Sequence, residues 1–277
     1  MPELPEVETV RAQLSSKIRG KKIKSAQKFH PRTMNPRTEH NLDAVIGAQI
    51  IEVRRRGKYM WFELNRPFAL VAHLGMSGQF YVQPVKDPRQ KHLRGLFELK
   101  TATSSPISLR FLDQRTFGWL SVEQLHDGIP TSALHIAPDQ FDSRFNAQAV
   151  IENYRRRRIQ IKTALLNQEI MSGVGNIYAD EALWKAKIKP TKLTNKLSEK
   201  ELQKILAATK AVMSAALKAG GTSFDTQYRN VNGESGYFER RLRVYGRDGL
   251  ACVRCRTKIK KIAFANRHSH FCPKCQR

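Results

Sequence analysis

The chain has 277 residues, enough for two modest domains, and its hydrophobic content of 40% allows a core in each. Its 49 lysines and arginines outnumber 24 aspartates and glutamates, so the formal net charge is +25. A globular protein this basic repels itself unless a polyanion neutralises it, which favours nucleic acid as the partner. A ribosome-associated protein and a membrane-surface binder are the alternatives that charge alone leaves open.

Apolar stretches and cysteines indicate the cellular compartment in which the chain is expected. No stretch reaches the roughly 18 apolar residues that a membrane span needs. The first ten residues carry Glu3, Glu6 and Glu8 and lack an apolar run, so we expect no signal peptide. All four cysteines cluster near the C-terminus, which in a reducing compartment favours metal binding over disulfides. We therefore expect a cytoplasmic protein, located at the nucleoid in a bacterium.

The first half of the chain reads as one helix followed by strands. Apolar residues recur at helical spacing over residues 7–18, which predicts a helix there. Short apolar runs separated by Gly, Pro, Asp and Ser then fill residues 50–120 and are typical of a sandwich or barrel. These runs are 50–53, 59–62, 70–73, 80–82 and 109–112.

The second half reads as helical. A linker is predicted at residues 131–141, where the composition changes after Pro130 and Pro138 occurs. Helical patterns follow at 145–154, 159–167, 177–186 and 197–217. Gly220 and Gly221 end the last of them, and the cysteine module closes the chain.

Two C-x-x-C pairs form the cysteine module: Cys252 with Cys255, and Cys272 with Cys275. Two such pairs at this separation strongly indicate zinc, because four thiolates complete a tetrahedral shell and leave no open position for catalysis. We therefore predict one structural zinc ion, with unliganded core cysteines as the alternative. Between the pairs lie several cations, which suit insertion of a hairpin against DNA but also fit a solvated basic surface.

The N-terminus offers a possible nucleophile. Removal of Met1, which bacterial processing favours before a small residue, leaves Pro2 with a free secondary amine. Such an amine attacks an aldehyde-like carbon, for example C1′ of a sugar, and gives an iminium, while Glu3 is placed to move protons. The alternative is an ordinary helix entry, where acidic residues are favoured.

Four separated segments together resemble the bacterial formamidopyrimidine-DNA glycosylase family. They are PELPEVETV at 2–10, GVGNIYADE at 173–181, GYF at 236–238 with VYG at 244–246, and NRHSHFCP at 266–273. The resemblance implies an α+β fold: a β-sandwich domain with flanking helices, a helical helix–two-turn–helix domain and a zinc-finger β-hairpin. We assign these to residues 1–130, 142–235 and 236–277.

The same resemblance implies an activity. It is excision of 8-oxoguanine and formamidopyrimidines from duplex DNA during base excision repair, followed by β,δ-elimination at the abasic site, by a protein that acts as a monomer. Pro2 matches the Schiff-base nucleophile and Glu3 the proton donor that helps open the sugar. Lys58 matches a lysine tied to β-elimination and phosphate contact, and Arg267 an arginine tied to δ-elimination.

The family's DNA-contacting positions also have counterparts. The damaged base must leave the stack before C1′ can be reached, so the gap must be filled and the orphaned base held. The matching residues are Met76, Arg115 and Phe117 for filling, and His92, Arg158, Lys162 and Asn176 for contact. Five of them have a plainer alternative: Met76 and Phe117 as core, Arg115 paired with Asp113, Asn176 as a helix N-cap, and Arg158, with the arginines at 155–157, as solvated surface.

The chain departs from the family pattern at two places. NRHS at 266–269 replaces a frequent GRST but keeps Arg267, and the loop at 223–232, implicated in holding the flipped base, is not the commonest version. An endonuclease VIII-type glycosylase for oxidised pyrimidines is the nearest rival, but it usually has Gly where this chain has Leu4. A non-catalytic zinc-dependent DNA-binding protein and an RNA-binding zinc protein are the rivals from other classes.

Overall fold

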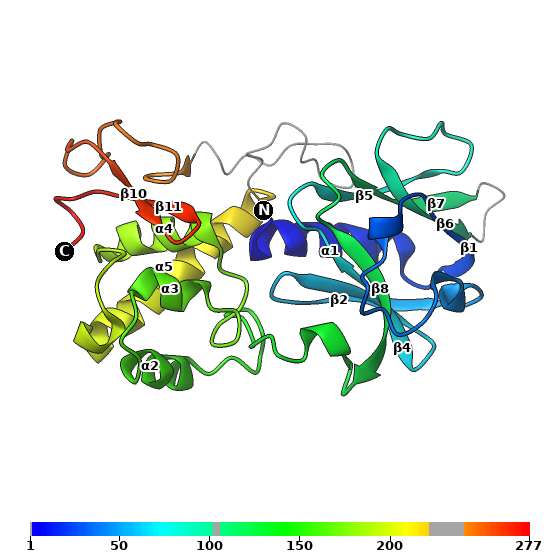
Figure 1. Cartoon of the computed structure of the whole chain (residues 1–277), viewed down its shortest axis with the longest axis horizontal. Helices are drawn as coiled ribbons and strands as arrows, with labels where there is room; N and C mark the ends of the chain where they lie inside the picture. The colour runs from blue at the N-terminus through cyan, green and yellow to red at the C-terminus, as the bar shows by residue number, and fades with distance from the viewer. Residues whose placement is uncertain (1, 102–105, 222–240) are drawn as a thin grey trace. The chain divides into compact units, whose positions relative to one another are not determined.

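A computed structural model describes residues 2–101, 106–221 and 241–277 (Figure 1). By contacts it divides into two compact units, one running to His135 and including Gly220 and Gly221, the other comprising 136–219 and the C-terminal part of the chain. The predicted base-pocket loop at 223–232 and the GYF motif at 236–238 lie outside the described residues. Among the helices described, none is long and apolar enough to cross a membrane.

The first unit begins with helix α1 (Leu4–Ile18). Glu3 is its N-cap and forms a capping box with Glu6, while Pro5 occupies the first turn, where its missing N–H costs nothing. The helix predicted from residue 7 is therefore confirmed but begins earlier.

Two antiparallel sheets make up the rest of this unit. The first has the order β1-β6-β7-β5 and the second the order β2-β3-β4-β8-β9. The strands of the first are β1 (Lys22–Lys28), β6 (Leu93–Lys100), β7 (Ile107–Asp113) and β5 (Gly78–Pro84). Those of the second are β2 (Ile50–Arg56), β3 (Tyr59–Leu64), β4 (Phe68–His73), β8 (Trp119–His126) and β9 (Ile129–Pro130). The five predicted runs lie within β2, β3, β4, β5 and β7 and are confirmed.

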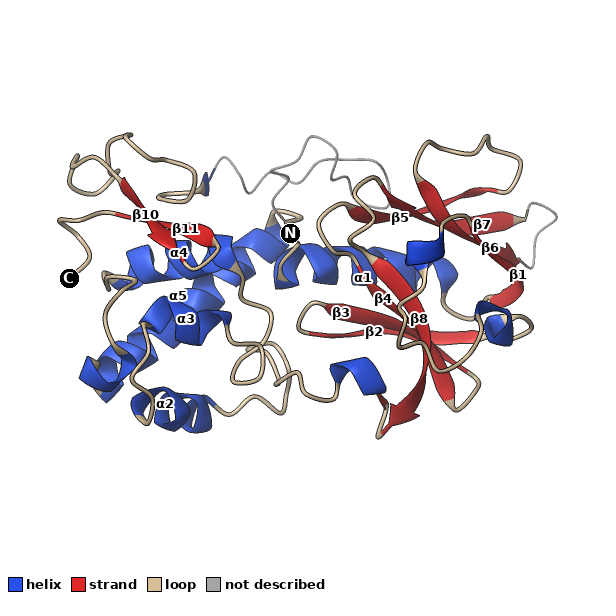
Figure 2. Cartoon of the chain, in the orientation of Figure 1, coloured by secondary structure: helices blue, strands red, loops and turns tan. Residues whose placement is uncertain are grey.

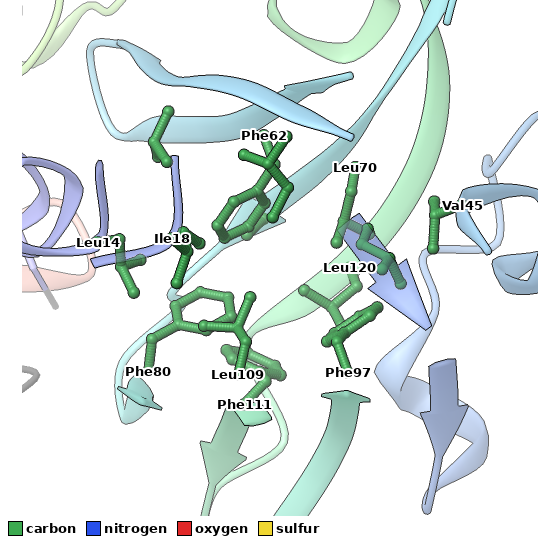
Figure 3. Close-up of a cluster of buried hydrophobic side chains, with 14 of the residues drawn as sticks. Leu14, Ile18, Val45, Phe62, Leu70, Phe80, Phe97, Leu109, Phe111 and Leu120 are labelled. Carbon is green, nitrogen blue, oxygen red and sulfur yellow. The ribbon is translucent and has the colours of Figure 1, made fainter. Parts of the chain in front are cut away.

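A single apolar core joins both sheets and α1 (Figure 3). Phe62 of β3 meets Phe80 of β5 edge-on, with ring centroids 5.6 Å apart, so the contact crosses from one sheet to the other. Leu14 and Ile18 of α1 pack into the same cluster and are fully buried. This packing of two sheets face to face confirms the predicted sandwich.

The second unit is helical and ends in a hairpin (Figure 2). Its helices are α2 (Ala147–Arg155), α3 (Ile161–Leu166), α4 (Asn176–Ala186) and α5 (Glu199–Lys218), so all four predicted helical patterns are confirmed with ends shifted by a few residues. A capping box of Ser198 and Glu201 starts α5. Strands β10 (Lys260–Phe264) and β11 (Arg267–Phe271) form the hairpin between the two cysteine pairs.

Candidate active site and nucleic-acid interface

The predicted nucleophile and proton donor stand together at the start of α1. Pro2 and Glu3 are both buried, and Glu3 has 2% of its surface exposed. The Glu3 backbone N–H donates to Glu6 Oε2 at 2.9 Å, and the Glu3 carboxylate accepts the Glu6 backbone N–H. The helix entry is therefore confirmed, and it also fixes the Glu3 carboxylate on the first turn of α1, one residue after Pro2. Its catalytic role stays a prediction.

An arginine links α1 to the turn that carries Lys58. Arg55 Nε donates to Glu8 Oε2 at 2.9 Å, and its Nη1 donates to the Gly57 carbonyl at 3.1 Å. Burial raises the pKa of Glu8, but hydrogen bonds and charges from Arg11 and Arg55 outweigh it, so that pKa lies below its usual value. Lys58 follows Gly57 directly and is 9% exposed. The ion pair thus sets where Lys58 stands relative to the N-terminal helix.

His73 is the neutral neighbour of this lysine. Its ring stacks on Trp119 with centroids 5.6 Å apart, and its Nδ1 accepts the Gly75 N–H at 3.2 Å. Burial, followed by the charge of Lys58, lowers the pKa of His73 to about 4. At neutral pH His73 therefore adds no second positive charge beside Lys58 and acts as a hydrogen-bond acceptor.

The three predicted gap-filling residues lie on two adjacent loops. Met76 is 39% exposed and Phe117 is 56% exposed, so the alternative that they are core residues is wrong. The guanidinium of Arg115 lies 3.7 Å from Met76 Sδ, which brings the two loops together at their tips. The carboxylate of Asp113 is engaged instead by Ser77 and by the Gly118 N–H, and no ion pair between it and Arg115 is observed in the part of the chain described.

His92 lies beside the same loops. It has a positive φ of 67°, is half-buried, and its carbonyl accepts the Asp113 N–H at 3.0 Å. With Lys91, Gln79 and Tyr81 it lines an open cavity of about 270 Å³. The structure thus brings these four residues to one end of strands β5, β6 and β7, although they lie far apart in the sequence: Met76, His92, Arg115 and Phe117.

Lys162, predicted to contact DNA, is instead an interior residue. Its side chain is 0% exposed and pairs with the equally buried Asp180 at 2.7 Å. Its Nζ also donates to the His268 carbonyl at 3.1 Å. The side chain has no exposed surface in this structure, and the predicted direct contact with DNA stays a prediction. Lys162 holds the residue that follows Arg267 in the hairpin.

Asn176 requires a correction. The N-cap of α4 is Gly175, and Asn176 is the first helical residue, so the predicted N-cap role is wrong. Its Nδ2 donates to the His268 carbonyl at 3.1 Å, while its buried Oδ1 has no hydrogen-bond partner among the residues that the structure describes. Two side chains from the helical domain, Asn176 and Lys162, therefore converge on one carbonyl of β11.

The two remaining predicted cations are exposed. Arg158 follows α2 and lies in the four-arginine run. Arg267 begins β11, directly after the turn of the hairpin, where Ala265 takes a positive φ of 48°. Both side chains are free to reach a ligand, and both contacts stay predictions.

The four cysteines fit a zinc ion. Their Sγ atoms all lie within 4.8 Å of one another, and tetrahedral Zn–S bonds of about 2.3 Å correspond to S–S separations of about 3.8 Å, which a small shift of the side chains provides. Hydrogen bonds from Thr257 lower the pKa of Cys255 to about 6, which favours its thiolate, whereas burial raises the pKa values of Cys272 and Cys275. These residues would hold one structural zinc, and with four protein ligands the ion would have no position for substrate.

Two adjacent acids on α4 attach the cysteine module, and they were not predicted from the sequence. Asp180 accepts Ser269 Oγ and the His270 N–H, both at 2.8 Å. Glu181 accepts backbone N–H groups from 243–245 at 2.8–3.0 Å. Burial raises the pKa of Glu181, and these hydrogen bonds partly offset it. Two consecutive acids in an otherwise apolar helix of so basic a chain are the signal that could have identified them.

Known protein domains account for most of the chain. Residues 1–120 match the formamidopyrimidine-DNA glycosylase N-terminal domain, and residues 136–228 match the H2TH domain of the same proteins. Residues 249–277 match a zinc finger found in FPG and IleRS. All three models name formamidopyrimidine-DNA glycosylases, and the third names IleRS as well.

Full-length relatives and solved structures agree with these domains. The formamidopyrimidine-DNA glycosylase of Acidothermus cellulolyticus is 48% identical, over 100% of this chain and 97% of that protein. The protein of the same name from Salinispora arenicola is 47% identical, over 100% and 96%. A Lactococcus lactis Fpg complex with abasic-site DNA has a TM-score of 0.87 at 35% identity, covering 99% of each chain. A variant of that protein bound to Fapy-dG DNA matches with a TM-score of 0.87 at 35% identity, covering 100% of each chain.

Proposed function

Since the chain belongs to the formamidopyrimidine-DNA glycosylase family, we propose that it removes oxidised purines from duplex DNA and then cuts the strand. The substrates are 8-oxoguanine and formamidopyrimidines, and the solved relatives that hold abasic-site and Fapy-dG DNA support this class. The observation that carries the proposal is the buried Pro2–Glu3 pair at the start of α1, in the same unit as Lys58.

The first step is displacement of the base. With Met1 removed, the lone pair of the Pro2 amine forms a bond to C1′ as the bond from C1′ to the base breaks. The base leaves with a proton, and Glu3 supplies the proton that lets the sugar oxygen depart as the ring opens. The product is an iminium joining Pro2 to the opened sugar.

The second step is strand cleavage. The iminium withdraws electrons, so loss of a proton from C2′ expels the 3′ phosphate, and a second elimination expels the 5′ phosphate. We assign Lys58 to the first elimination and to phosphate contact, and Arg267 to the second. His73 supports Lys58 by staying neutral, because a charged imidazole next to it would repel the ammonium group.

The remaining residues hold the DNA. Met76, Arg115 and Phe117 fill the space that the everted base leaves, and an apolar wedge beside a cation suits that task. His92, Arg158 and Arg267 contact phosphates, and Asn176 and Lys162 position the hairpin that bears Arg267. We assign residues 1–130 to the catalytic domain, 131–141 to a linker, 142–235 to the helix–two-turn–helix domain and 236–277 to the zinc finger. The protein acts as a monomer in the bacterial cytoplasm, at the nucleoid.

Borohydride trapping tests the chemistry. The substrate is a duplex with one 8-oxoguanine opposite cytosine, and the protein is first shown by mass to lack Met1. We expect a covalent adduct that peptide mapping places at Pro2, and none with Glu3→Gln under the same conditions. An adduct only with oxidised pyrimidines would assign the chain to the endonuclease VIII-type activity, and no adduct with any lesion would leave a DNA-binding role.

Salt dependence tests the electrostatic part. If the chain neutralises 6–10 phosphates, its affinity for duplex DNA falls by about 10³–10⁵ between 50 and 200 mM salt. The net charge of +25 motivates this expectation. A flat response to salt would contradict it.

A further inference from the structure

Asp113 is a buried carboxylate with one oxygen for each of two loops. It ends β7 and is 1% exposed. Its Oδ1 accepts a hydrogen bond from Ser77 Oγ, in the loop of Met76. Its Oδ2 accepts the Gly118 N–H at 2.7 Å, at the end of the loop that carries Arg115 and Phe117. One side chain therefore binds both loops at their bases.

Ser77 extends this connection to the arginine. While its hydroxyl donates to Asp113, its oxygen accepts the Arg115 backbone N–H at 3.0 Å. The position of Arg115 thus depends on Asp113 through a single hydroxyl. The backbone of Asp113 adds a third segment, because its N–H donates to the His92 carbonyl and its carbonyl accepts Arg94 Nε at 2.8 Å.

The two loops also touch directly, backbone against backbone. A Cβ added at Gly75 would lie 2.4 Å from the Gly118 nitrogen and 2.4 Å from the Phe117 carbonyl carbon. Gly75 also takes a positive φ of 58°, which disfavours any side chain. The loops are therefore fitted to one another, and neither has room to shift independently.

We propose that Asp113 is a positioning residue that joins these loops into one preorganised wedge, on which recognition of the base opposite the lesion depends. The proposal rests on the proposed function, because Met76, Arg115 and Phe117 need a gap to fill. Its physical basis is preorganisation: donors already fixed in place lose no freedom when DNA binds, whereas loops released from Asp113 must be ordered at that moment. The effect is largest for Arg115, since hydrogen bonds to one base and not another require a fixed geometry.

Opposite-base selectivity is the test. The ratio of kcat/KM for 8-oxoguanine opposite cytosine to that opposite adenine is measured for wild type, Ser77→Ala and Asp113→Asn, with Arg115→Ala marking complete loss. We expect both loop variants to lower the ratio about tenfold, the effect of roughly one hydrogen bond. Asp113→Asn tests the same connection, because an amide has one oxygen where the carboxylate has two. It can therefore accept from Ser77 or from Gly118 but not from both.

Two further variants separate positioning from general destabilisation. Ser108→Ala is the matched control, because Ser108 is a fully buried serine on β7 whose Oγ donates to the Gln83 carbonyl at 3.2 Å and accepts from Arg110. It should lower the thermal midpoint and leave the ratio unchanged. Ser77→Thr keeps a hydroxyl and should restore the ratio lost in Ser77→Ala.

Each outcome decides something. If Ser77→Ala and Asp113→Asn melt like Ser108→Ala and keep the wild-type ratio, Asp113 is structural only and the proposal is wrong. If Ser77→Ala or Asp113→Asn fails to fold, the fluorescence of 2-aminopurine placed opposite an abasic analogue is measured instead. The measurement compares wild type with Ser77→Thr, and the two proteins should give the same signal. If wild type itself excises no oxidised purine, the proposed function fails, and that result is distinct from a changed ratio.

Discussion

Replacing Lys162 with Met removes one half of a fully buried ion pair. At 2.7 Å and an effective dielectric constant of about 20, the gross attraction between Lys162 and Asp180 is roughly 6 kcal/mol, much of which offsets the cost of desolvating both ions. Breaking such a pair from one side costs about 3–5 kcal/mol. Asp180 keeps its hydrogen bonds from Ser269 and His270, so we expect the lower end, about 3 kcal/mol.

The loss should be local to the second unit. Urea unfolding measures the free energy, and hydrogen exchange followed by mass spectrometry measures protection of β10 and β11, which Lys162 and Asp180 hold. We expect protection of the hairpin to fall while zinc content is unchanged, since the cysteines are intact. The double variant Lys162→Met/Asp180→Leu removes the stranded charge, so the cycle should show a coupling energy of at least about 2 kcal/mol.

A direct phosphate contact of Lys162 would give a different result. If Lys162→Met leaves stability and hairpin protection unchanged but reduces the salt dependence of DNA affinity by about one unit of slope, then Lys162 touches DNA directly. The sequence-based prediction would then be right and the positioning role wrong.

Three further predictions concern the zinc, the buried histidine and the arginine that links α1 to Lys58. Cys272→Ser should lose zinc and DNA affinity while the first unit still unfolds cooperatively; normal lesion cleavage by that variant would contradict the structural role of the finger, and metal content is read by atomic absorption. Because the folded pKa of His73 is about 4, below its ordinary value of 6.5, its stabilising contribution is complete above pH 6.5 and is lost as pH falls toward 4, by roughly 3 kcal/mol. Wild type should therefore lose more unfolding free energy between pH 6.5 and 4 than His73→Phe, and equal slopes would refute the assignment. Arg55→Met should lower strand cleavage more than duplex affinity, because it frees the turn of Lys58 from Glu8; an equal loss of both, measured by single-turnover cleavage and titration, would argue against positioning.

The sequence by itself determined the features that depend on local spacing. The two C-x-x-C pairs identified all four zinc ligands, because a knuckle places its two thiolates from a few adjacent residues. The period of apolar residues located the helices of the second unit and five of the strands, because burial of one face imposes that period. Strand β1 (Lys22–Lys28) was missed, because Lys22, Lys24 and Lys28 leave too few apolar residues to show an alternating pattern.

Only the tertiary structure decided which polar side chains face solvent and which lie inside. The sequence does not distinguish Lys162 from the arginines at 155–158, but Lys162 is buried because it forms an ion pair with Asp180 of α4. The sequence suggests that Asn176 is a helix N-cap, but its side-chain amide donates a hydrogen bond to a carbonyl 92 residues away. Ser77 and Asp113 are 36 residues apart and meet because β5 and β7 are paired in register. A residue pattern reports its own neighbourhood, whereas these partners are set by strand pairing and helix packing, which only the folded chain fixes.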